Sequence, residues 1–212
     1  MLEWVVAGAR EAKRLAEVIV ATDDARIAEA CRAFGARALV TSPAHPTGTD
    51  RIAEAAAQLE ADVVVNVQGD EPLIAGFVID AVVDALAAAP ECALATAVHR
   101  AEPEAARDAN RVKAVLDRTG NALSFSRAAD PSAQPLWQHV GLYAYRREFL
   151  LKYVTLPQTP GELAEKLEQL RALEHGYAIR CAVIAGWHGV PVDVPGDVAR
   201  VEAELARRSA RA

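Results

Sequence analysis

Two short segments place an aspartate beyond an expected strand or apolar stretch, and the first of them suits a hard metal ion. Residues 68–72 read Gln-Gly-Asp-Glu-Pro, so that Asp70 offers a carboxylate and Gly69 lets a ligand approach the backbone closely. Asp193, within residues 192–197, follows a short apolar stretch and precedes an expected helix. A carboxylate at position 70 suits magnesium, whereas the segment around Asp193 alone indicates little. The alternatives are an aspartate in a tight turn at 70 and a helix cap at 193.

A third segment, residues 41–51, is a polar loop that contains Pro and Gly and leads into an expected helix. The free backbone N–H groups at the start of a helix favour an anion, so this loop is a candidate for binding part of a nucleotide. The alternative interpretation is that Thr49 or Asp50 caps the helix and that Arg51 lies on a solvated face.

The elements that must position these segments alternate between strands and helices. The apolar patterns predict helices over residues 2–15, 25–34, 51–59 and 77–88 and strands over residues 17–21, 38–40, 62–68 and 93–98. This alternation predicts an α/β fold with a parallel sheet covered on both sides. Ligands of such sheets bind beyond the carboxyl ends of the strands, which is where Asp70 lies.

Beyond residue 100 the alternation of strands and helices becomes less regular. We expect strands at 112–116, 140–145 and 179–184, and helices at 162–174 and 196–208.

Composition limits the class of protein. The 212 residues are 52% hydrophobic and 25% charged with a net charge of −6, and no segment concentrates Lys and Arg, so we expect no nucleic-acid binding. Cys31, Cys92 and Cys181 lie far apart among apolar residues, which predicts buried free thiols in a reducing compartment. With neither a signal peptide nor a membrane span in the sequence, we expect a cytoplasmic protein.

Six segments occur in one order between about residues 17 and 201: VIVATDD, TSPAHPTGTDRIAEA, VVVNVQGDEPLI, FSRA, HVGLYAYRREFL and KLEQLRALEHG. Together they resemble the 3-deoxy-manno-octulosonate (Kdo) cytidylyltransferase family. The resemblance implies transfer of CMP from CTP to the anomeric hydroxyl of Kdo, or of a relative such as its 8-amino analogue, for lipopolysaccharide synthesis. It also implies a homodimer and a Rossmann-like, GT-A-like three-layer sandwich. Residues 1–212 would form one domain, with a sugar-binding and dimerisation lobe over roughly 100–180.

The resemblance also assigns roles to residues. Asp70 and Asp193 are the implied magnesium ligands, and with Arg127 they are the candidate catalytic residues. The residues implied to face the nucleotide are Gln68, Thr49, Asp50 and Arg51, with Asp23 nearby.

The sugar acid is assigned to a second set. Arg127 would bind its carboxylate, which a planar guanidinium matches. The residues implied to bind the rest of the sugar are His139, Tyr143, Glu168 and Gln169. Without the motif, His139 and Tyr143 would be interpreted as strand packing, and Glu168 and Gln169 as an exposed helix face.

The family pattern begins with a strand and a triphosphate-binding loop that precede the helix at residue 2. We therefore expect this sequence to lack that first strand, with neighbouring strand edges left unpaired. This leaves open a second function, a non-catalytic sugar-binding or partner subunit that cannot hold CTP. A dinucleotide-dependent oxidoreductase is disfavoured, because no GxGxxG follows any expected strand.

Overall fold

The computed structural model describes residues 1–212 apart from 102–106, 129–134, 193 and 210–212, and it divides into two compact units. Unit 1 comprises Met1–Ala44, Val67–Asp80 and His188–Ala212, and unit 2 comprises His45–Asn66 and Ala81–Trp187. Each unit has a buried apolar cluster of its own. We describe the units separately.

Unit 1 contains a two-stranded parallel sheet, formed by β1 (Ile19–Thr22) and β2 (Arg37–Val40). Its helices are α1 (Leu2–Arg10), α2 (Ala25–Ala33) and α8 (Pro195–Ser209). The Asp24 side chain caps α2 by accepting a hydrogen bond from the backbone N–H of Arg26, and Gly35, with φ 69°, follows its end. Among the described residues, β1 pairs with β2 alone.

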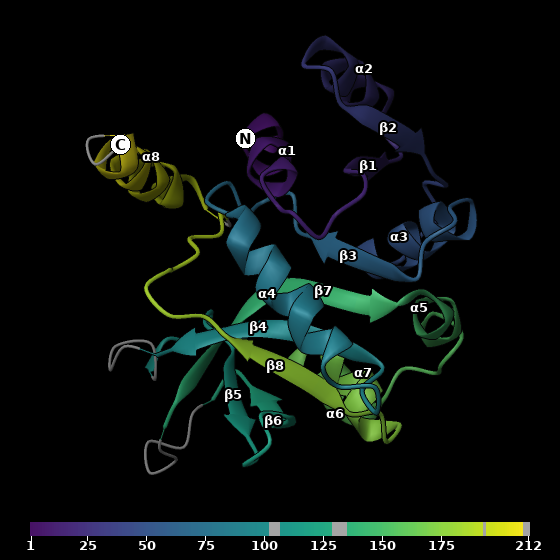
Figure 1. Ribbon diagram of the computed structural model, residues 1–212, viewed down its shortest axis with the longest axis vertical. Coiled ribbons are helices and arrows are strands. Elements are labelled where there is room, and N and C mark those ends of the chain that lie inside the picture. Colours follow the sequence, from purple (N-terminus) through teal and green to yellow (C-terminus); the bar gives the residue numbers. More distant parts are fainter. Residues whose placement is uncertain (102–106, 129–134, 193, 210–212) are drawn as a thin grey trace. The chain divides into compact units, whose positions relative to one another are not determined.

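Unit 2 contains a six-stranded sheet in the order β6-β5-β7-β4-β8, with β3 paired to β7 (Figure 1). The strands are β3 (Val63–Val67, whose last residue belongs to unit 1), β4 (Leu94–Arg100), β5 (Lys113–Leu116), β6 (Ala122–Ser126), β7 (Trp137–Arg146) and β8 (Ile179–Val183). The helices are α3 (Gly48–Ala57), α5 (Arg147–Tyr153), α6 (Pro160–Glu165) and α7 (Gln169–Glu174), and the boundary between the units falls within α4 (Gly76–Ala87).

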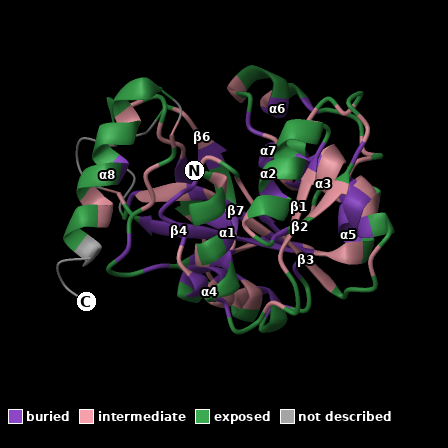
Figure 2. Ribbon diagram, turned by 90° about the horizontal axis from the view of Figure 1, so that it is seen from above, coloured by how far each residue is buried: buried purple, intermediate pink, exposed green. Residues whose placement is uncertain are grey.

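The core of unit 2 explains why these segments form strands and helices. Six of the seven residues of β4 are buried, as a central strand requires, and the inner faces of α5 and α7 pack into the same apolar cluster. Figure 2 shows β4 in the colour of buried residues. Polar groups that are buried in this apolar interior need hydrogen-bond partners.

The α/β class is confirmed, but the expectation of a purely parallel sheet is wrong. The strands β1 and β2 are parallel, as are β4 and β8, whereas β7 runs antiparallel to both β4 and β5. The strand β6, which pairs antiparallel with β5, was not expected, and neither was helix α5.

Three expected helices differ from those observed. The helix expected at 162–174 is two helices, because Lys166 adopts a left-handed conformation (φ 55°) at the end of α6. The helix expected at 51–59 begins at Gly48 and is capped by the side chain of Thr47, so the alternative that Thr49 or Asp50 caps it is wrong. The helix expected at 2–15 ends at Arg10.

The cysteine prediction is confirmed, since Cys31, Cys92 and Cys181 are all free and buried. Within the part of the chain that the structure describes, no helix has both the length and the apolar character needed to cross a bilayer.

Candidate functional site

A cluster of polar side chains in unit 2 joins the start of α3 to the start of α7. The hydroxyl of Thr49 is buried and donates a hydrogen bond of 2.7 Å to Oε2 of Glu168, although the two residues are 119 positions apart. Burial raises the pKa of Glu168, and the hydrogen bond from Thr49 opposes this shift. No described residue donates to the other carboxylate oxygen, Oε1, which is left to accept a hydrogen bond from a ligand.

Next to Glu168, Gln169 is a buried amide with an unsatisfied donor. Its side chain is 5% exposed, and its Nε2 has no hydrogen-bond partner in the described structure. A buried donor without a partner costs about 1–3 kcal/mol. A ligand oxygen at this position would remove that cost. The interpretation of these two residues as an exposed helix face is therefore wrong.

A buried ion pair supports this end of α7. Arg171 donates two hydrogen bonds to Glu162 of α6, of 2.8 Å from Nε and 2.5 Å from Nη2, and both side chains are almost completely buried. The guanidinium also lies 4.8 Å from the ring centre of Tyr153, whose hydroxyl donates to the backbone carbonyl of Glu168. Burial alone would raise the pKa of Glu162, but Arg171 lowers it below its ordinary value.

Arg127 follows β6 and is held by backbone groups. Its Nε donates to the carbonyl of Glu165 at 2.9 Å and its Nη1 to the carbonyl of Ala109 at 3.2 Å. The buried Lys113 in turn donates 2.7 Å to the carbonyl of Arg127. The structure gives Nη2 of Arg127 no acceptor among the residues it describes, so this edge of the guanidinium can take a carboxylate oxygen.

His139 and Tyr143 belong to a row of rings along β7. The ring of His139 lies 5.1 Å from that of Phe125 and 5.4 Å from that of Tyr143, and the row continues to Tyr145 at 5.9 Å. Burial lowers the pKa of His139 to about 3, so the imidazole is neutral at physiological pH. Burial raises the pKa of Tyr143 well above its usual value.

The same cluster extends to the loop before α3. Burial raises the pKa of Tyr145 well above its usual value, while a hydrogen bond with Thr49 opposes the shift. Asp50 receives a 2.7 Å hydrogen bond from the hydroxyl of Thr47. Thr49 thus contacts both Glu168 and Tyr145, the ring of Tyr145 lies against that of Tyr143, and Arg127 is attached to α6.

Unit 1 holds the other candidate residues that the structure describes. Gln68 and Asp70 follow β3 in a turn in which the carbonyl of Gln68 accepts from the backbone N–H of Glu71 at 3.3 Å. The backbone carbonyl of Asp70 accepts from the N–H of Val192 at 2.9 Å, which brings the residue before Asp193 to this turn. Asp193 itself lies outside the described residues. Asp23 is exposed at the end of β1.

No group of three or more His, Cys, Asp or Glu side chains in the described ranges is arranged to hold a metal ion. The magnesium prediction rests on Asp70 together with Asp193, so it remains a prediction.

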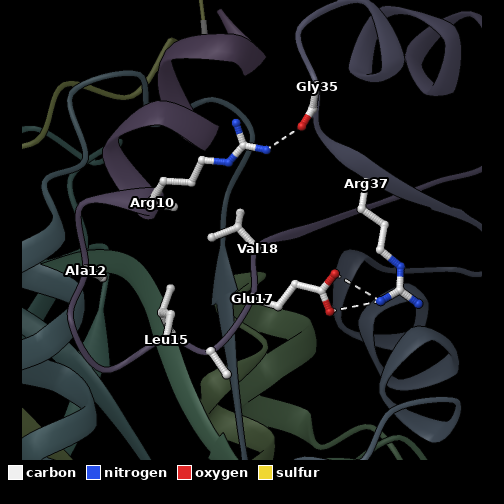
Figure 3. Close-up of a pocket in the computed structure, with 9 residues that line it drawn as sticks. Arg10, Ala12, Leu15, Glu17, Val18, Gly35 and Arg37 are labelled. Atoms are coloured by element: carbon white, nitrogen blue, oxygen red, sulfur yellow. Dashed lines mark hydrogen bonds and ion pairs between the residues drawn. The ribbon is translucent and has the colours of Figure 1, made fainter.

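A pocket of ≈ 380 Å³ lies within unit 1, between α1 and the start of β1 (Figure 3). Arg10 donates to the carbonyl of Gly35 at its rim, and Glu17 pairs with Arg37 there at 2.9 Å. None of the residues predicted from the sequence lines it. Its charged groups are already paired, which makes it a poor site for an anion.

Residues that carry the site in unit 2 were missed from the sequence. Glu162 and Arg171 looked like ordinary members of the helix expected at 162–174, and Tyr153 lies in α5, which was not expected. Thr96, which bonds to His139, looked like a core residue of β4. A threonine within an otherwise apolar strand is the one signal that could have drawn attention to it.

Comparisons with known proteins agree with one another. Residues 1–179 match a family described as Cytidylyltransferase. The 3-deoxy-manno-octulosonate cytidylyltransferases of Myxococcus xanthus and Geobacter metallireducens are 48% and 45% identical to this chain, over 98% of it and 87% and 88% of their own lengths. A solved structure of CMP:2-keto-3-deoxy-manno-octonic acid synthetase complexed with CTP superposes with a TM-score of 0.91 at 37% identity, covering 98% of this chain and 88% of the other.

A more distant structure shows the fold alone. It is a 4-diphosphocytidyl-2C-methyl-D-erythritol synthase from Anaerococcus prevotii, with a TM-score of 0.65 at 10% identity, over 97% of this chain and 88% of its own.

Proposed function

Since this chain belongs to the cytidylyltransferase family, we propose that it transfers CMP from CTP to the anomeric hydroxyl of Kdo, releasing pyrophosphate. The observation that carries the proposal is the high identity to Kdo cytidylyltransferases over nearly the whole chain. The same similarity favours an enzyme over a non-catalytic partner subunit.

The reaction joins two anions. A bond forms between the anomeric oxygen of the sugar and the α-phosphorus of CTP, the bond from that phosphorus to the pyrophosphate oxygen breaks, and the hydroxyl proton is released. Little covalent work falls to the protein, so positioning and neutralisation of charge dominate.

The unit 2 cluster has the donors and acceptors that a polyhydroxy acid needs. Arg127 keeps Nη2 for the carboxylate, Glu168 keeps Oε1 for a hydroxyl proton, and Gln169 keeps Nε2 for a hydroxyl oxygen. His139 and Tyr143 form a partly exposed face of rings beside them. These side chains are held by their own packing and hydrogen bonds, so the site is ordered before a sugar arrives.

Magnesium belongs to the proposal, with Asp70 and Asp193 as its ligands. Carboxylate oxygens suit this ion, and the 2.9 Å hydrogen bond between Val192 and Asp70 keeps the two segments together. When bound, magnesium would neutralise charge on the phosphates. The nucleotide-facing roles of Asp23, Gln68, Asp50 and Arg51, the homodimer and the cytoplasmic location remain predictions from the resemblance.

Release of pyrophosphate from CTP, Kdo and Mg²⁺ by the purified protein tests this function. We expect release that requires all three components, with CMP-Kdo as the product identified by mass spectrometry. A parallel reaction with 8-amino-Kdo identifies the preferred sugar acid. Folded protein that releases no pyrophosphate with either sugar would rule the proposal out.

A further inference from the structure

The pairing of β4 with β7 contains an irregularity beside His139. Thr96 pairs with Tyr143, but the next residue, Ala97, pairs with Val140. The two residues of β7 between them, 141 and 142, therefore have no pairing partner on β4. The backbone carbonyls in such a bulge need a donor from elsewhere.

Thr96 supplies that donor. Its side chain is fully buried, and its Oγ1 lies 2.8 Å from the carbonyl oxygen of Leu142 and 3.3 Å from that of Val140. The same Oγ1 lies 2.9 Å from Nε2 of His139. A single hydroxyl therefore faces two carbonyl oxygens and an imidazole nitrogen.

The direction in which the Thr96 hydroxyl donates its proton determines which ring nitrogen of His139 carries a hydrogen. A carbonyl oxygen can only accept, so the close contact with Leu142 is favourable only if Thr96 donates its one proton there. The oxygen of Thr96 then accepts from His139, which places the ring proton on Nε2. In a neutral imidazole the other nitrogen, Nδ1, must then carry the lone pair.

Nδ1 of His139 is left for a ligand. The described residues include no donor to it, and the ring itself is partly exposed. The edge-on packing of Phe125 at 5.1 Å and the ring of Tyr143 hold the imidazole in place. A lone pair held here attracts a hydroxyl proton and repels a carboxylate.

We propose that Thr96 is a positioning residue that fixes His139 as the Nε2–H tautomer, so that Nδ1 accepts a hydrogen bond from a sugar hydroxyl and offers no proton to a carboxylate. This inference rests on the proposed function for the identity of the sugar. It fixes the orientation of the sugar acid, whose carboxylate binds at Arg127 and one of whose hydroxyls binds at His139.

Thr96→Val and Thr96→Ser are the matched variants, because Val keeps the shape without the hydroxyl and Ser keeps the hydroxyl. Ile179→Val, in the buried part of β8, controls for a general loss of core packing. Nitrogen-15 NMR of the imidazole nitrogens reports the tautomer directly, and a His139→Gln variant assigns the signal.

We expect wild type and Thr96→Ser to show proton-bearing Nε2, and Thr96→Val to lose that signature. The KM for Kdo should rise about tenfold in Thr96→Val, as expected for one misplaced hydrogen bond, while the KM for CTP stays constant. Ile179→Val should change neither the tautomer nor the KM for Kdo.

A wild-type His139 with its proton on Nδ1 would overturn the proposal, as would a Thr96→Val protein with unchanged tautomer and KM. If Thr96→Val fails to fold, the tautomer of the wild-type protein and the kinetics of Thr96→Ser still test the proposal. A protein that shows the Nε2–H tautomer but releases no pyrophosphate would refute the proposed function and leave the tautomer assignment standing.

Discussion

The candidate residues of unit 2 and those of unit 1 are held in different ways. In unit 2, Glu168 is fixed by a side-chain hydrogen bond from Thr49, and the adjacent helices are joined by the buried pair of Glu162 and Arg171. In unit 1, backbone hydrogen bonds are found at the turn that contains Asp70, including the one from Val192. The side chains that we propose for the sugar acid are thus positioned by side-chain contacts, whereas a main-chain hydrogen bond joins the turn at Asp70 to Val192.

The largest effect should come from removing the unit 1 carboxylate. Asp70→Ala should lower kcat/KM about 10³-fold, or about 4 kcal/mol, because a metal ligand acts on charge in the transition state. Its melting temperature shows whether the fold is retained, and the backbone hydrogen bond to Val192 does not depend on the side chain. Pyrophosphate release and thermal unfolding measure the two quantities. Glu60→Ala, which removes an exposed carboxylate elsewhere, is the control. Full activity in Asp70→Ala would remove this residue from the site.

In unit 2 the largest effect should be on stability. Arg171→Met leaves Glu162 charged and buried, which should cost about 3–5 kcal/mol of unfolding free energy in urea titrations. The double variant with Glu162→Gln should recover part of that loss. Because the pKa of Glu162 is lowered in the folded protein, the contribution of the pair is present at neutral pH and disappears as pH falls below 4.5. A loss below about 1 kcal/mol would show that the pair does not stabilise this end of α7.

Substitution of Gln169 should raise the stability of the protein and weaken its binding of the sugar. Gln169→Leu removes a buried unsatisfied donor, so the variant should gain about 1–3 kcal/mol of stability. The KM for Kdo should rise about tenfold, because the sugar loses one hydrogen bond. Urea unfolding and initial rates at saturating CTP measure both effects. Reduced stability with an unchanged KM would mean that the amide has a structural partner and no ligand.

The smallest effect at neutral pH should come from the titration of His139, which changes stability only in acid. The pKa of His139 is about 3 in the folded protein against an ordinary value of 6.5, so the unfolded chain binds a proton first as pH falls. Stability should therefore be complete above 6.5 and decrease by roughly 1.4 kcal/mol per pH unit toward 3. His139→Gln should flatten this slope in urea titrations at several pH values. An equal slope in both proteins would show that the surroundings of this ring do not lower its pKa.

Much of the fold could be predicted from local patterns. The β-branched run at 63–67 and the alternation with helices predicted the α/β class and most of the elements. The break at Lys166 could not be predicted, because residues 162–174 have the spacing of one continuous helix. Next to the break, Tyr153 of α5 donates a hydrogen bond to the carbonyl of Glu168, a contact that the helical spacing of 162–174 does not specify. The strand β6 was missed because ALSFS is short and has no β-branched residue.

Less of the candidate site than of the fold could be predicted from the sequence. The motifs selected Glu168 and Gln169, but the spacing of adjacent helical residues gave no reason for both to be inside. In the structure α7 begins at Gln169, just after the break, and Gln169 is buried while Glu168 is partly exposed. The role of Thr96 depends on a bulge in the pairing of two strands, which no local pattern specifies.

The most direct test of sugar binding in unit 2 is an NMR titration of nitrogen-15-labelled protein with Kdo, in the presence of CTP and EDTA so that no turnover occurs. We predict that the side-chain amide of Gln169 and the ring nitrogens of His139 shift as Kdo is added. Saturable Kdo binding that leaves both groups unchanged would contradict the assignment of the sugar to this unit.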